Sequence, residues 1–541
     1  MAESFVLFNS YEFLVLFLPT VFAGFFVLAG ARQHRLAGAW LTAASLCFYG
    51  WWNPVHVPLL MGSMGFNYLV GRRLARRPAG TLLFFGIAVN ILLLGYFKYT
   101  GFLASSLDQA FGLGWTIPNI VLPLAISFFT FQQIAYLSDA HDGVAVEHGF
   151  VNYCLFITFF PHLIAGPITH HREMLPQFND PETFRPRLDN ISVGLTLFLL
   201  GLFKKVAIAD PLGENVRPIF AAAADGTPLT LLDAWGGALS YTLQIYFDFS
   251  GYSDMAIGLG LMFGISLPPN FNSPFKARNI IEFWSRWHMT LTRFLTAYIY
   301  NPLVLRVTRA RMRAGSPLPR RGRMTPATFA TLVAIPTIVT MFISGVWHGA
   351  GWQFVVFGLL HGFYLTVNHG WRALKAHWGW RDSEHFLARG AAVLLTFICV
   401  VIALVFFRAA DVSAATNLLS GMVGAHGVII HPTLKEVPGM KLLVELFGIP
   451  VGDAPYFNLK RMFPLPLLLF IVWTLPNTQQ WLRHYRTALG FKASAGWLER
   501  ILPASAWRPT PVFGFLVGTF GVFALIRALS QAPTEFLYFQ F

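Results

Sequence analysis

Long apolar runs separated by short polar segments dominate the pattern of the chain. Each run is close to the length that an α-helix needs to cross a bilayer, so the pattern predicts transmembrane helices. The runs cover residues 11–30, 37–52, 54–71, 81–97, 119–137, 150–165, 190–209, 233–247, 326–346, 350–368, 388–407, 463–476 and 511–528. Several are short or contain Gly and Pro, so we expect about eleven to thirteen spans, some of them broken or re-entrant.

The fold class predicted is an all-α polytopic membrane protein, in which a single multi-pass domain fills residues 1–541. No repeat, low-complexity tract or domain boundary divides the sequence. The first run follows Met-Ala-Glu-Ser, without a basic n-region or a small-residue cleavage site. We therefore expect a retained span there and not a signal peptide.

Composition supports the membrane assignment. Of the 541 residues, 55% are hydrophobic and only 12% are charged, whereas soluble chains average about a quarter charged residues. A disordered chain, a coiled coil and a cytosolic enzyme are thereby excluded. The three cysteines lie in apolar runs without metal-ligand spacing, so we expect neither a disulfide framework nor a metal site.

The charge is strongly basic, with 39 Lys and Arg against 25 Asp and Glu and a net charge of +14. In a membrane protein this excess indicates cytoplasmic loops and not nucleic acid. Arginines follow the first and third runs, at 32–35 and 72–77, which places the N-terminus outside. The densest cluster, 306–323, contains Pro and Gly and is predicted to be a cytoplasmic loop. It would contact lipid headgroups or, alternatively, the phosphates of a donor.

The motifs of common soluble enzymes are absent. The sequence has no Walker A loop, no G-x-S-x-G elbow and no H-E-x-x-H pair. These absences disfavour ATP-driven transport and serine hydrolysis. What remains is a small set of polar side chains inside apolar sequence, where their cost makes each one a functional hypothesis.

Two carboxylates lie in the glycine-rich apolar stretch 244–264, namely Asp248 and Asp254. At this depth they need cationic or hydrogen-bonding partners, for which an arginine from the following segment is one choice. Two roles stay open for these carboxylates. They could form buried ion pairs that hold the helices together, or they could take part directly in catalysis.

His288 lies in a polar-apolar stretch, Asn279–Pro302, whose period predicts one helix. Glu282 and Arg286 are spaced to pair at i,i+4, and His288 shares a face with Trp284. The helix could lie in the membrane interface. His288 could be a packed polar residue or a functional one, and both alternatives stay open.

His348 lies deep in apolar sequence, within Met341–Trp352, between small residues and two tryptophans. A neutral histidine is the side chain best able to accept a hydroxyl proton near pH 7. The small neighbours would leave room for a substrate. We therefore expect His348 to be functional, although a histidine inside the membrane could equally bond a backbone carbonyl, and both alternatives stay open. Weaker candidates are His361, His369 and the pair His170 and His171, which we expect at the surface.

The segment 535–541 is unusually aromatic for a chain terminus, with four aromatic residues and a leucine. Such a segment must be buried in something. It could anchor at the bilayer surface, or it could insert into a pocket and present the phenol of Tyr538.

These motifs together resemble the membrane-bound O-acyltransferases, and most closely their bacterial alginate O-acetylation branch. The resemblance is carried by QIYFDFSGYSDMAIGLG, EFWSRWHMTLTRFLTAYIY, GVWHGAGW, LPLAISFFTFQQIAYLSD, FITFFPHLIAGPI and FFRA. These segments span almost the whole chain. One departure is visible at 301–305, where the chain reads NPLVL and similar proteins usually read I-P-L-G-G. This difference leaves the donor or partner contact, and hence the substrate, open.

The resemblance implies a ring of helices around a central tunnel, with His348 and His288 as catalytic residues. It implies no permanently bound cofactor. The co-substrate would be acetyl-CoA or an acylated carrier protein on the cytoplasmic side of a bacterial inner membrane. An extracytoplasmic SGNH-type, esterase-like partner would place the acyl group on a polysaccharide such as alginate. The aromatic segment resembles the F-I-Y-F-x-F ending of this branch, in which the tyrosine is a proposed transient acyl carrier; that residue is Tyr538 here.

A physical mechanism follows from this implication. The donor would be inside and the acceptor outside, and a tunnel would hold both in near-attack geometry. His348 would act as general base, and backbone amides, Trp347 or His288 would stabilise the oxyanion. A phenol is more acidic than a sugar hydroxyl, which favours a relay through Tyr538. Alternatives are transfer of D-alanyl or another acyl group, or a non-enzymatic transporter that uses Asp248 and Asp254 for ion coupling.

Overall fold

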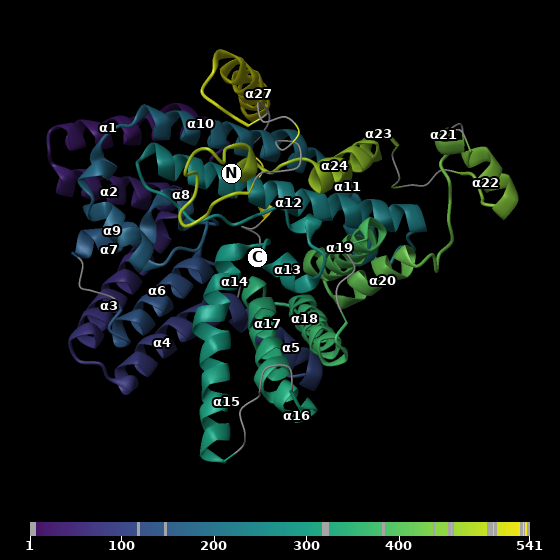
Figure 1. Ribbon diagram of the computed structural model, residues 1–541, viewed down its shortest axis with the longest axis horizontal. Helices are drawn as coiled ribbons and strands as arrows, with labels where there is room; N and C mark the ends of the chain where they lie inside the picture. Colours follow the sequence, from purple (N-terminus) through teal and green to yellow (C-terminus); the bar gives the residue numbers. More distant parts are fainter. Residues whose placement is uncertain are drawn as a thin grey trace. The chain divides into compact units, whose positions relative to one another are not determined.

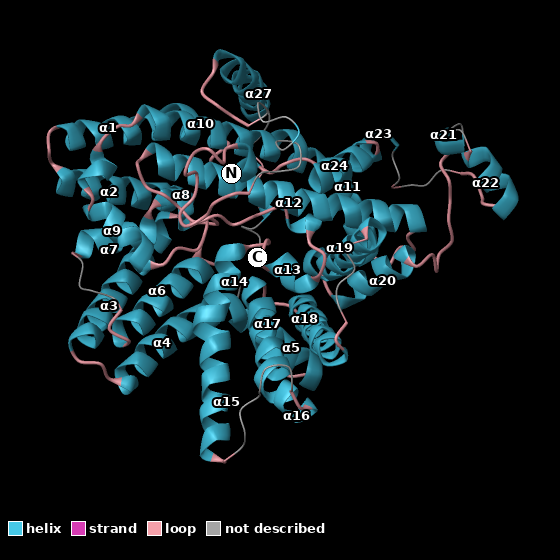
Figure 2. Ribbon diagram, viewed as in Figure 1, coloured by secondary structure: helices cyan, strands magenta, loops and turns pink. Residues whose placement is uncertain are grey.

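The structure is a computed structural model, and most of the chain that it describes is helical (Figures 1 and 2). It describes residues 7–115, 120–144, 149–315, 324–380, 385–435, 439–452, 456, 459–494, 501, 506–530, 534 and 536–537. Within these residues the only β-type pairing is an isolated bridge between Ile430 and Val451. The prediction of an all-α protein is therefore confirmed.

The described chain forms two compact units that exchange segments. The first unit contains 1–207, 248–270 and 478–541, and the second contains 208–247 and 271–477. Helix α12 (Leu231–Met262) is continuous and contributes its first half to the second unit and its second half to the first. The single domain predicted for 1–541 stays a prediction.

The first unit is built mainly from the N-terminal helices. Among them, α3, α4 and α6 lie side by side, and α1 packs on α2 (Figure 1). Its α-helices are α1 (Leu18–Gly30), α2 (His34–Trp52), α3 (Val57–Arg76), α4 (Gly80–Leu94), α5 (Thr100–Phe111), α6 (Ile126–His141), α7 (Phe150–Thr158), α8 (Phe160–Leu163), α9 (His171–Asn179), α10 (Leu188–Phe203), α25 (Thr478–Trp481) and α27 (Pro511–Ser530). Short π- or 3₁₀-helical turns are η1 (Glu12–Phe17), η2 (Pro54–His56), η3 (Gly95–Tyr99), η4 (Pro181–Phe184) and η5 (Lys204–Ala209), of which the last two residues belong to the second unit.

The second unit is organised around two antiparallel neighbours, α17 and α18, which lie side by side in Figure 1. Its α-helices are α11 (Asp210–Ala224), α13 (Ile280–Trp284), α14 (Met289–Leu295), α15 (Asn301–Arg313), α16 (Pro326–Phe329), α17 (Ile335–His348), α18 (Trp352–Trp378), α19 (Phe386–Arg408), α20 (Val412–Met422), α21 (Pro432–Lys435), α22 (Met440–Phe447), α23 (Leu459–Met462) and α24 (Pro464–Thr474). Short turns are η6 (Pro274–Lys276), η7 (Thr296–Tyr300) and η8 (Ala330–Ala334).

Six helical stretches of the described chain are long and apolar enough to cross a membrane. They are Glu12–Gly30, Gly80–Phe111, Leu188–Ala224, Pro326–His348, Phe386–Arg408 and Pro511–Ser530. The other predicted spans correspond to helices that are shorter or more polar, such as α6 and α24. The chain is thus a multi-pass membrane protein, while the higher count of about eleven to thirteen spans and the ring around a tunnel stay predictions.

Glycine pairs bring two helices of the first unit into close backbone contact. A Cβ on Gly194 of α10 would lie 2.5 Å from the carbonyl oxygen of Gly258 on α12, and one on Gly201 would lie 2.5 Å from that of Gly251. Both distances are far below van der Waals contact, so only glycine allows this approach. The contact brings the end of α10 and the lysines that follow it against the second half of α12.

A second glycine contact joins α17 to α18 in the second unit. A Cβ on Gly345 would lie 2.3 Å from the carbonyl oxygen of Phe354, and one on Gly358 would lie 2.4 Å from that of Met341. We expected the small residues near His348 to leave room for substrate, and for Gly345 and Gly349 this is wrong. Their space is taken by α18, because the Phe354 ring covers Gly349.

The basic cluster 306–323 also differs from its prediction as a loop. Arg306, Arg309, Arg311 and Arg313 lie on α15, and the remainder of the cluster that was assigned to the loop, 316–323, lies outside the described residues. The prediction is wrong for 306–313 because Pro302 falls in the first turn of α15, where proline is tolerated. The first glycine after Pro302 is Gly315. It lies just after the end of α15 and has a positive φ of 69°, which is typical of a residue that terminates a helix.

Candidate functional site

The backbone around His288 is not the continuous helix that its period predicts. Helix α13 ends at Trp284, and α14 begins at Met289 with His288 as its N-cap residue. His288 has φ 42° and ψ 53°, in the left-handed region that few non-glycine residues occupy. Side-chain and tertiary hydrogen bonds explain the break: the Thr292 hydroxyl donates to the Trp284 carbonyl at 3.0 Å. That carbonyl no longer needs a helical N–H.

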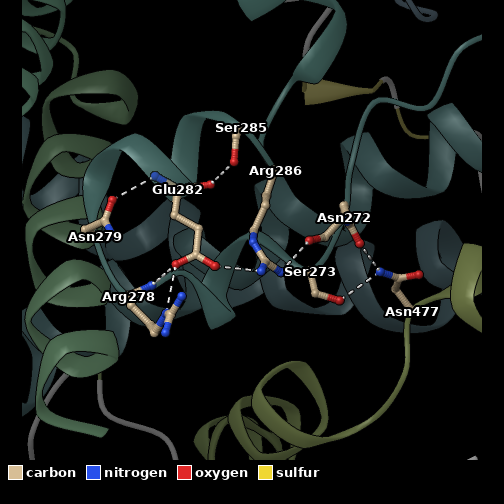
Figure 3. Close-up of polar contacts among 8 residues, drawn as sticks. All are labelled: Asn272, Ser273, Arg278, Asn279, Glu282, Ser285, Arg286 and Asn477. Atoms are coloured by element: carbon tan, nitrogen blue, oxygen red, sulfur yellow. Dashed lines mark hydrogen bonds and ion pairs between the residues drawn. The ribbon is translucent and has the colours of Figure 1, made fainter. Parts of the chain in front are cut away.

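A network of polar side chains holds α13 and the turn after it (Figure 3). The Arg286 guanidinium donates to Oε1 of Glu282 at 2.6 Å, so the predicted i,i+4 pair is confirmed. The backbone N–H of Arg278 donates to the other oxygen of Glu282 at 2.9 Å. The Asn272 N–H donates to the Arg286 carbonyl, and the Asn477 amide donates to Asn272. Glu282 thereby fixes both ends of α13.

The charge on Glu282 is stabilised by these contacts. Partial burial raises the pKa of Glu282, but the Arg278 N–H and the guanidinium groups of Arg286 and Arg278 outweigh it and lower the pKa below its usual value. Glu282 is therefore ionised at neutral pH. It has a positioning role for the turn that carries His288.

His348 is the last residue of α17, and it is buried in an aromatic pocket of the second unit. Its ring lies against Trp347, Phe357 and Phe407, with centroid separations of 4.8, 5.8 and 5.0 Å. All three contacts are edge-to-face, the geometry that aromatic pairs favour. The three rings come from α17, α18 and α19, so three helices fix the orientation of one imidazole.

Trp347 connects His348 to His288. The centroid of its ring lies 6.3 Å from that of His288 and 4.8 Å from that of His348. Both histidines and the indole are at most 5% exposed. The two histidines expected to be catalytic therefore both contact a single aromatic side chain, although sixty positions of sequence separate them.

His361 belongs to the same cluster, although its sequence context made it only a weak candidate. Its Nδ1 accepts a hydrogen bond from the Trp284 indole N–H at 3.2 Å, and its ring contacts Phe357, which also contacts His348. The feature of the sequence that could have indicated this is that His361 lies three positions after Gly358, about one helical turn along α18. That spacing places His361 on the glycine-lined face that packs on α17.

The protonation state of His288 follows from its surroundings. Burial lowers the pKa of His288 to about 3, because the charged imidazolium loses its hydration. At neutral pH His288 is thus an uncharged imidazole with one N–H, able to donate to a developing oxyanion but not to supply a positive charge. The arrangement offers two imidazoles and an indole inside an apolar enclosure, which suits proton transfer coupled to oxyanion stabilisation.

Asp248 and Asp254 lie in the first unit, on the second half of α12, and both are buried. Their cationic partners are two consecutive lysines of η5: Lys204 lies 2.6 Å from Asp254, and Lys205 lies 2.8 Å from Asp248. The expectation of buried ion pairs is confirmed. An arginine from the following segment was suggested as the cation, but the pairing lysines precede α12 and belong to η5, directly after α10.

Tyr538, the predicted acyl carrier, lies outside the residues that the structure describes. Its neighbours Phe536 and Leu537 are described and belong to the first unit: the Phe536 ring is buried beside Lys205, and the Leu537 N–H donates to Asp248. His170 and His171 are both 2% exposed, so the expectation that they lie at the surface is wrong. Among the described residues, no group of three or more His, Cys, Asp or Glu side chains could hold a metal ion.

The fold and this cluster define a class of protein: a multi-pass α-helical membrane protein with paired buried histidines. The sequence of residues 144–315 matches the profile of MBOAT, the membrane-bound O-acyltransferase family. Two relatives, described below, are 40% and 37% identical to the chain over most of their length. The chain therefore belongs to the membrane-bound O-acyltransferase family. It is an acyltransferase.

Relatives of three kinds are similar to the chain. The peptidoglycan O-acetyltransferase of Helicobacter pylori is 40% identical over 80% of this chain and 82% of its own length. The probable alginate O-acetylase AlgI of Pseudomonas aeruginosa is 37% identical over 99% of this chain and the whole of its own length. The teichoic acid D-alanyltransferase of Streptococcus thermophilus is 28% identical over 47% of this chain and 58% of its own.

Proposed function

We propose that the chain transfers an acetyl group from a cytoplasmic thioester, acetyl-CoA or an acylated carrier protein, toward an extracytoplasmic polysaccharide. The observation that supports this proposal is the contact of Trp347 with both His288 and His348 in one buried cluster. The names of the two relatives with the higher identity, an O-acetyltransferase and an O-acetylase, favour acetyl over other acyl groups. The bacterial inner membrane, with the N-terminus outside, is the location that suits such a donor and acceptor.

In the proposed step, His348 takes the proton of the acceptor hydroxyl as the oxygen attacks the thioester carbonyl. The N–H of neutral His288 and the Trp347 indole are the candidate donors to the oxyanion. When the carbon–sulfur bond breaks, the proton held by His348 passes to the leaving thiolate. The products are an ester and a free thiol, so His348 returns to its neutral form without a bound cofactor.

The acceptor proposed for this step is the phenol of Tyr538, which would then pass the group to an SGNH-type extracytoplasmic partner. A phenolate is a better leaving group than a sugar alkoxide, so the relay divides a difficult transfer into two easier ones. The final acceptor is a polysaccharide such as alginate or a similar glycan.

The test uses purified full-length protein with labelled acetyl thioester and measures both thiol release and label on the protein. His348→Gln should reduce turnover by about 10²- to 10⁴-fold, the usual contribution of a general base. His369→Gln is the matched control, because His369 lies on α18 two turns beyond His361 and outside the cluster. Full turnover in folded His348→Gln would exclude the general-base role.

Transfer of D-alanyl is the second candidate, because the chain is also 28% identical to a teichoic acid D-alanyltransferase over about half its length. Acetyl and D-alanyl thioesters offered in competition decide between the two, with the mass added to the protein as the readout. A preference for D-alanyl would replace the acetyl assignment and leave the roles of His348 and His288 unchanged.

A further inference from the structure

Two adjacent lysines form two separate ion pairs in the first unit, one of them partly buried and the other buried. Lys204 and Lys205 begin η5, a π-helical turn that continues α10, and such turns displace side chains from the regular helical register. Lys204 pairs with Asp254 and Lys205 with Asp248. The side chains of Lys205 and Asp248 are each 2% exposed. The two pairs are alike in chemistry and lie six positions apart on α12.

The pairs differ in what completes them. The Thr478 hydroxyl donates to Asp254 at 2.8 Å and accepts from Lys204 at 2.8 Å, so a fixed side chain completes the first pair. The second pair contacts the aromatic segment: the Leu537 N–H donates to Oδ2 of Asp248 at 2.9 Å. The oxygen that binds Lys205 is the other one, Oδ1. Asp248 therefore bridges a lysine and a backbone amide with different oxygens.

Phe536 contacts the cation of the same pair. The Lys205 ammonium lies 4.6 Å from the centroid of the Phe536 ring, within the range of a cation–π interaction, which is strongest where water is excluded. Tyr252 of α12 packs edge-to-face on Phe536, with 4.8 Å between the ring centroids. Phe536 is 1% exposed, so the ring is enclosed and not lying on a surface.

These contacts have the form of a receptor for a peptide. The ammonium binds a ring face, the carboxylate accepts from the N–H of the next residue, and the Tyr252 ring packs against the same phenylalanine. A buried ion pair alone is costly because its charges lose water, and additional hydrogen bonds to its free valences offset that cost. The aromatic segment supplies one such hydrogen bond, from the Leu537 N–H to Asp248, and the face of the Phe536 ring stabilises the Lys205 ammonium.

We propose that the Lys205–Asp248 pair is the docking site of Phe536 and Leu537, and that it recognises an aromatic residue followed by a backbone N–H. Lys205, Asp248 and Tyr252 are positioning residues: they hold Phe536 and Leu537 and so set the point at which Tyr538 is attached. The contacts of Phe536 and Leu537 support the docking site whether or not the proposed function is correct. The role of the docking site in acyl transfer rests on the proposed function.

Docking is tested in the full chain with a single 4-fluorophenylalanine at position 536, followed by ¹⁹F NMR in detergent micelles. The reference for an undocked ring is a synthetic peptide of residues 533–541 with the same label. We expect the protein resonance to be distinct from that of the peptide, and Lys205→Met to move it to the peptide position. Lys204→Met is the matched control and should leave it unchanged. Identical resonances in the two lysine variants would overturn the docking site.

A swapped pair separates docking from a merely structural role. Lys205→Asp combined with Asp248→Lys keeps two opposite buried charges, but it places an ammonium where Leu537 needs an acceptor. We expect the folded double variant to show the undocked resonance. A docked resonance in it would mean that the pair only stabilises the helices, which contradicts the proposal.

Changes in the segment itself keep the test independent of helix folding. Phe536→Leu retains an apolar side chain without a ring face, whereas Phe536→Trp retains the ring. We expect Phe536→Leu to reduce acyl loading of Tyr538 by about tenfold, in line with the loss of one desolvated cation–π contact, and Phe536→Trp to preserve it. Equal loading in the two variants would count against recognition of the ring.

The two proposals fail separately. If the ¹⁹F resonance depends on Lys205 but Tyr538→Phe supports normal polymer acylation, the docking site stands and the relay is wrong. If Tyr538 becomes acylated and the resonance does not depend on Lys205 or Asp248, the relay stands and the docking site is wrong.

Discussion

The indole N–H of Trp284 donates a hydrogen bond to Nδ1 of His361, with 3.2 Å between the nitrogens. Since Nδ1 is the acceptor, a neutral His361 carries its proton on Nε2. The bond also ties the last residue of α13 to α18, while the carbonyl of the same tryptophan accepts from Thr292 of α14. Trp284 therefore links the turn that carries His288 to the helix that packs on the His348 pocket.

Trp284→Phe is predicted to remove the hydrogen bond to His361 without leaving a large cavity in the cluster. The ring volume is largely kept, but the buried Nδ1 of His361 loses its donor, which costs about 1–3 kcal/mol for a buried group left unsatisfied. We expect a lower unfolding midpoint in detergent and reduced acyl transfer. Trp287→Phe, a change in a tryptophan that packs on Phe271 and Phe283, is the control for ring size. Equal effects from both variants would contradict a role for the indole hydrogen bond.

Gly345→Ala is predicted to separate α17 from α18. The new Cβ would lie 2.3 Å from the Phe354 carbonyl oxygen, and because the contact is with backbone, a side-chain rotation cannot relieve it. Overpacking of this kind costs about 1–3 kcal/mol, and it would displace the His348 ring from Phe357. Both thermal stability and turnover should fall.

Gly390→Ala is the matched control for that change. A Cβ at Gly390 of α19 meets nothing within 4 Å, so the substitution should raise helix stability by about 0.5–1 kcal/mol through its higher propensity. Thermal unfolding of the two variants side by side decides the point. A loss of stability at Gly390 equal to that at Gly345 would indicate a general sensitivity to alanine.

The helices were largely predictable from the sequence because apolar length is a local property. Their interruptions were not. The period of 279–302 favours one helix, but Thr292 satisfies the Trp284 carbonyl and Asn272 binds the Arg286 carbonyl. Such bonds come from residues distant in the fold or from a side chain that could equally have faced outward. These hydrogen bonds outweigh the local helix propensity, and His288 therefore adopts a left-handed backbone conformation.

The two histidines of the candidate site could be predicted from the sequence, but the side chains that they contact could not. His348 and His288 stood out as polar side chains in apolar sequence. The aromatic ring that joins them, Trp347, and the third imidazole, His361, depend on the packing of α17 on α18 through Gly345 and Gly358. The partners of Asp248 and Asp254 were missed for the same reason: glycine pairs bring α10 to α12, and a pattern read along one segment does not show which other segment will meet it.

Glu282→Gln is predicted to destabilise the turn that holds His288. The change keeps the shape and removes the charge that Arg286 and the Arg278 N–H stabilise. Because the pair is partly exposed, we expect a loss of about 1 kcal/mol or less, with a larger effect on turnover than on stability. Glu182→Gln is the control, since its pair with Arg185 is more exposed. No difference in turnover between the two variants would argue against a positioning role for Glu282.

The last prediction concerns the pH dependence of folding. His288 has a pKa lowered by burial to about 3 in the folded protein, against about 6.5 when unfolded. Below about pH 6.5 the unfolded chain binds a proton that the folded chain does not, so stability falls as the pH drops toward 3. Each pH unit within that window weakens folding by up to about 1.4 kcal/mol through this one group. His288→Asn, which tolerates a left-handed backbone, should flatten the curve of unfolding midpoint against pH between about 6 and 4. The unchanged protein is the reference, and a curve for His288→Asn that is as steep as the reference curve would show that His288 does not titrate in this window.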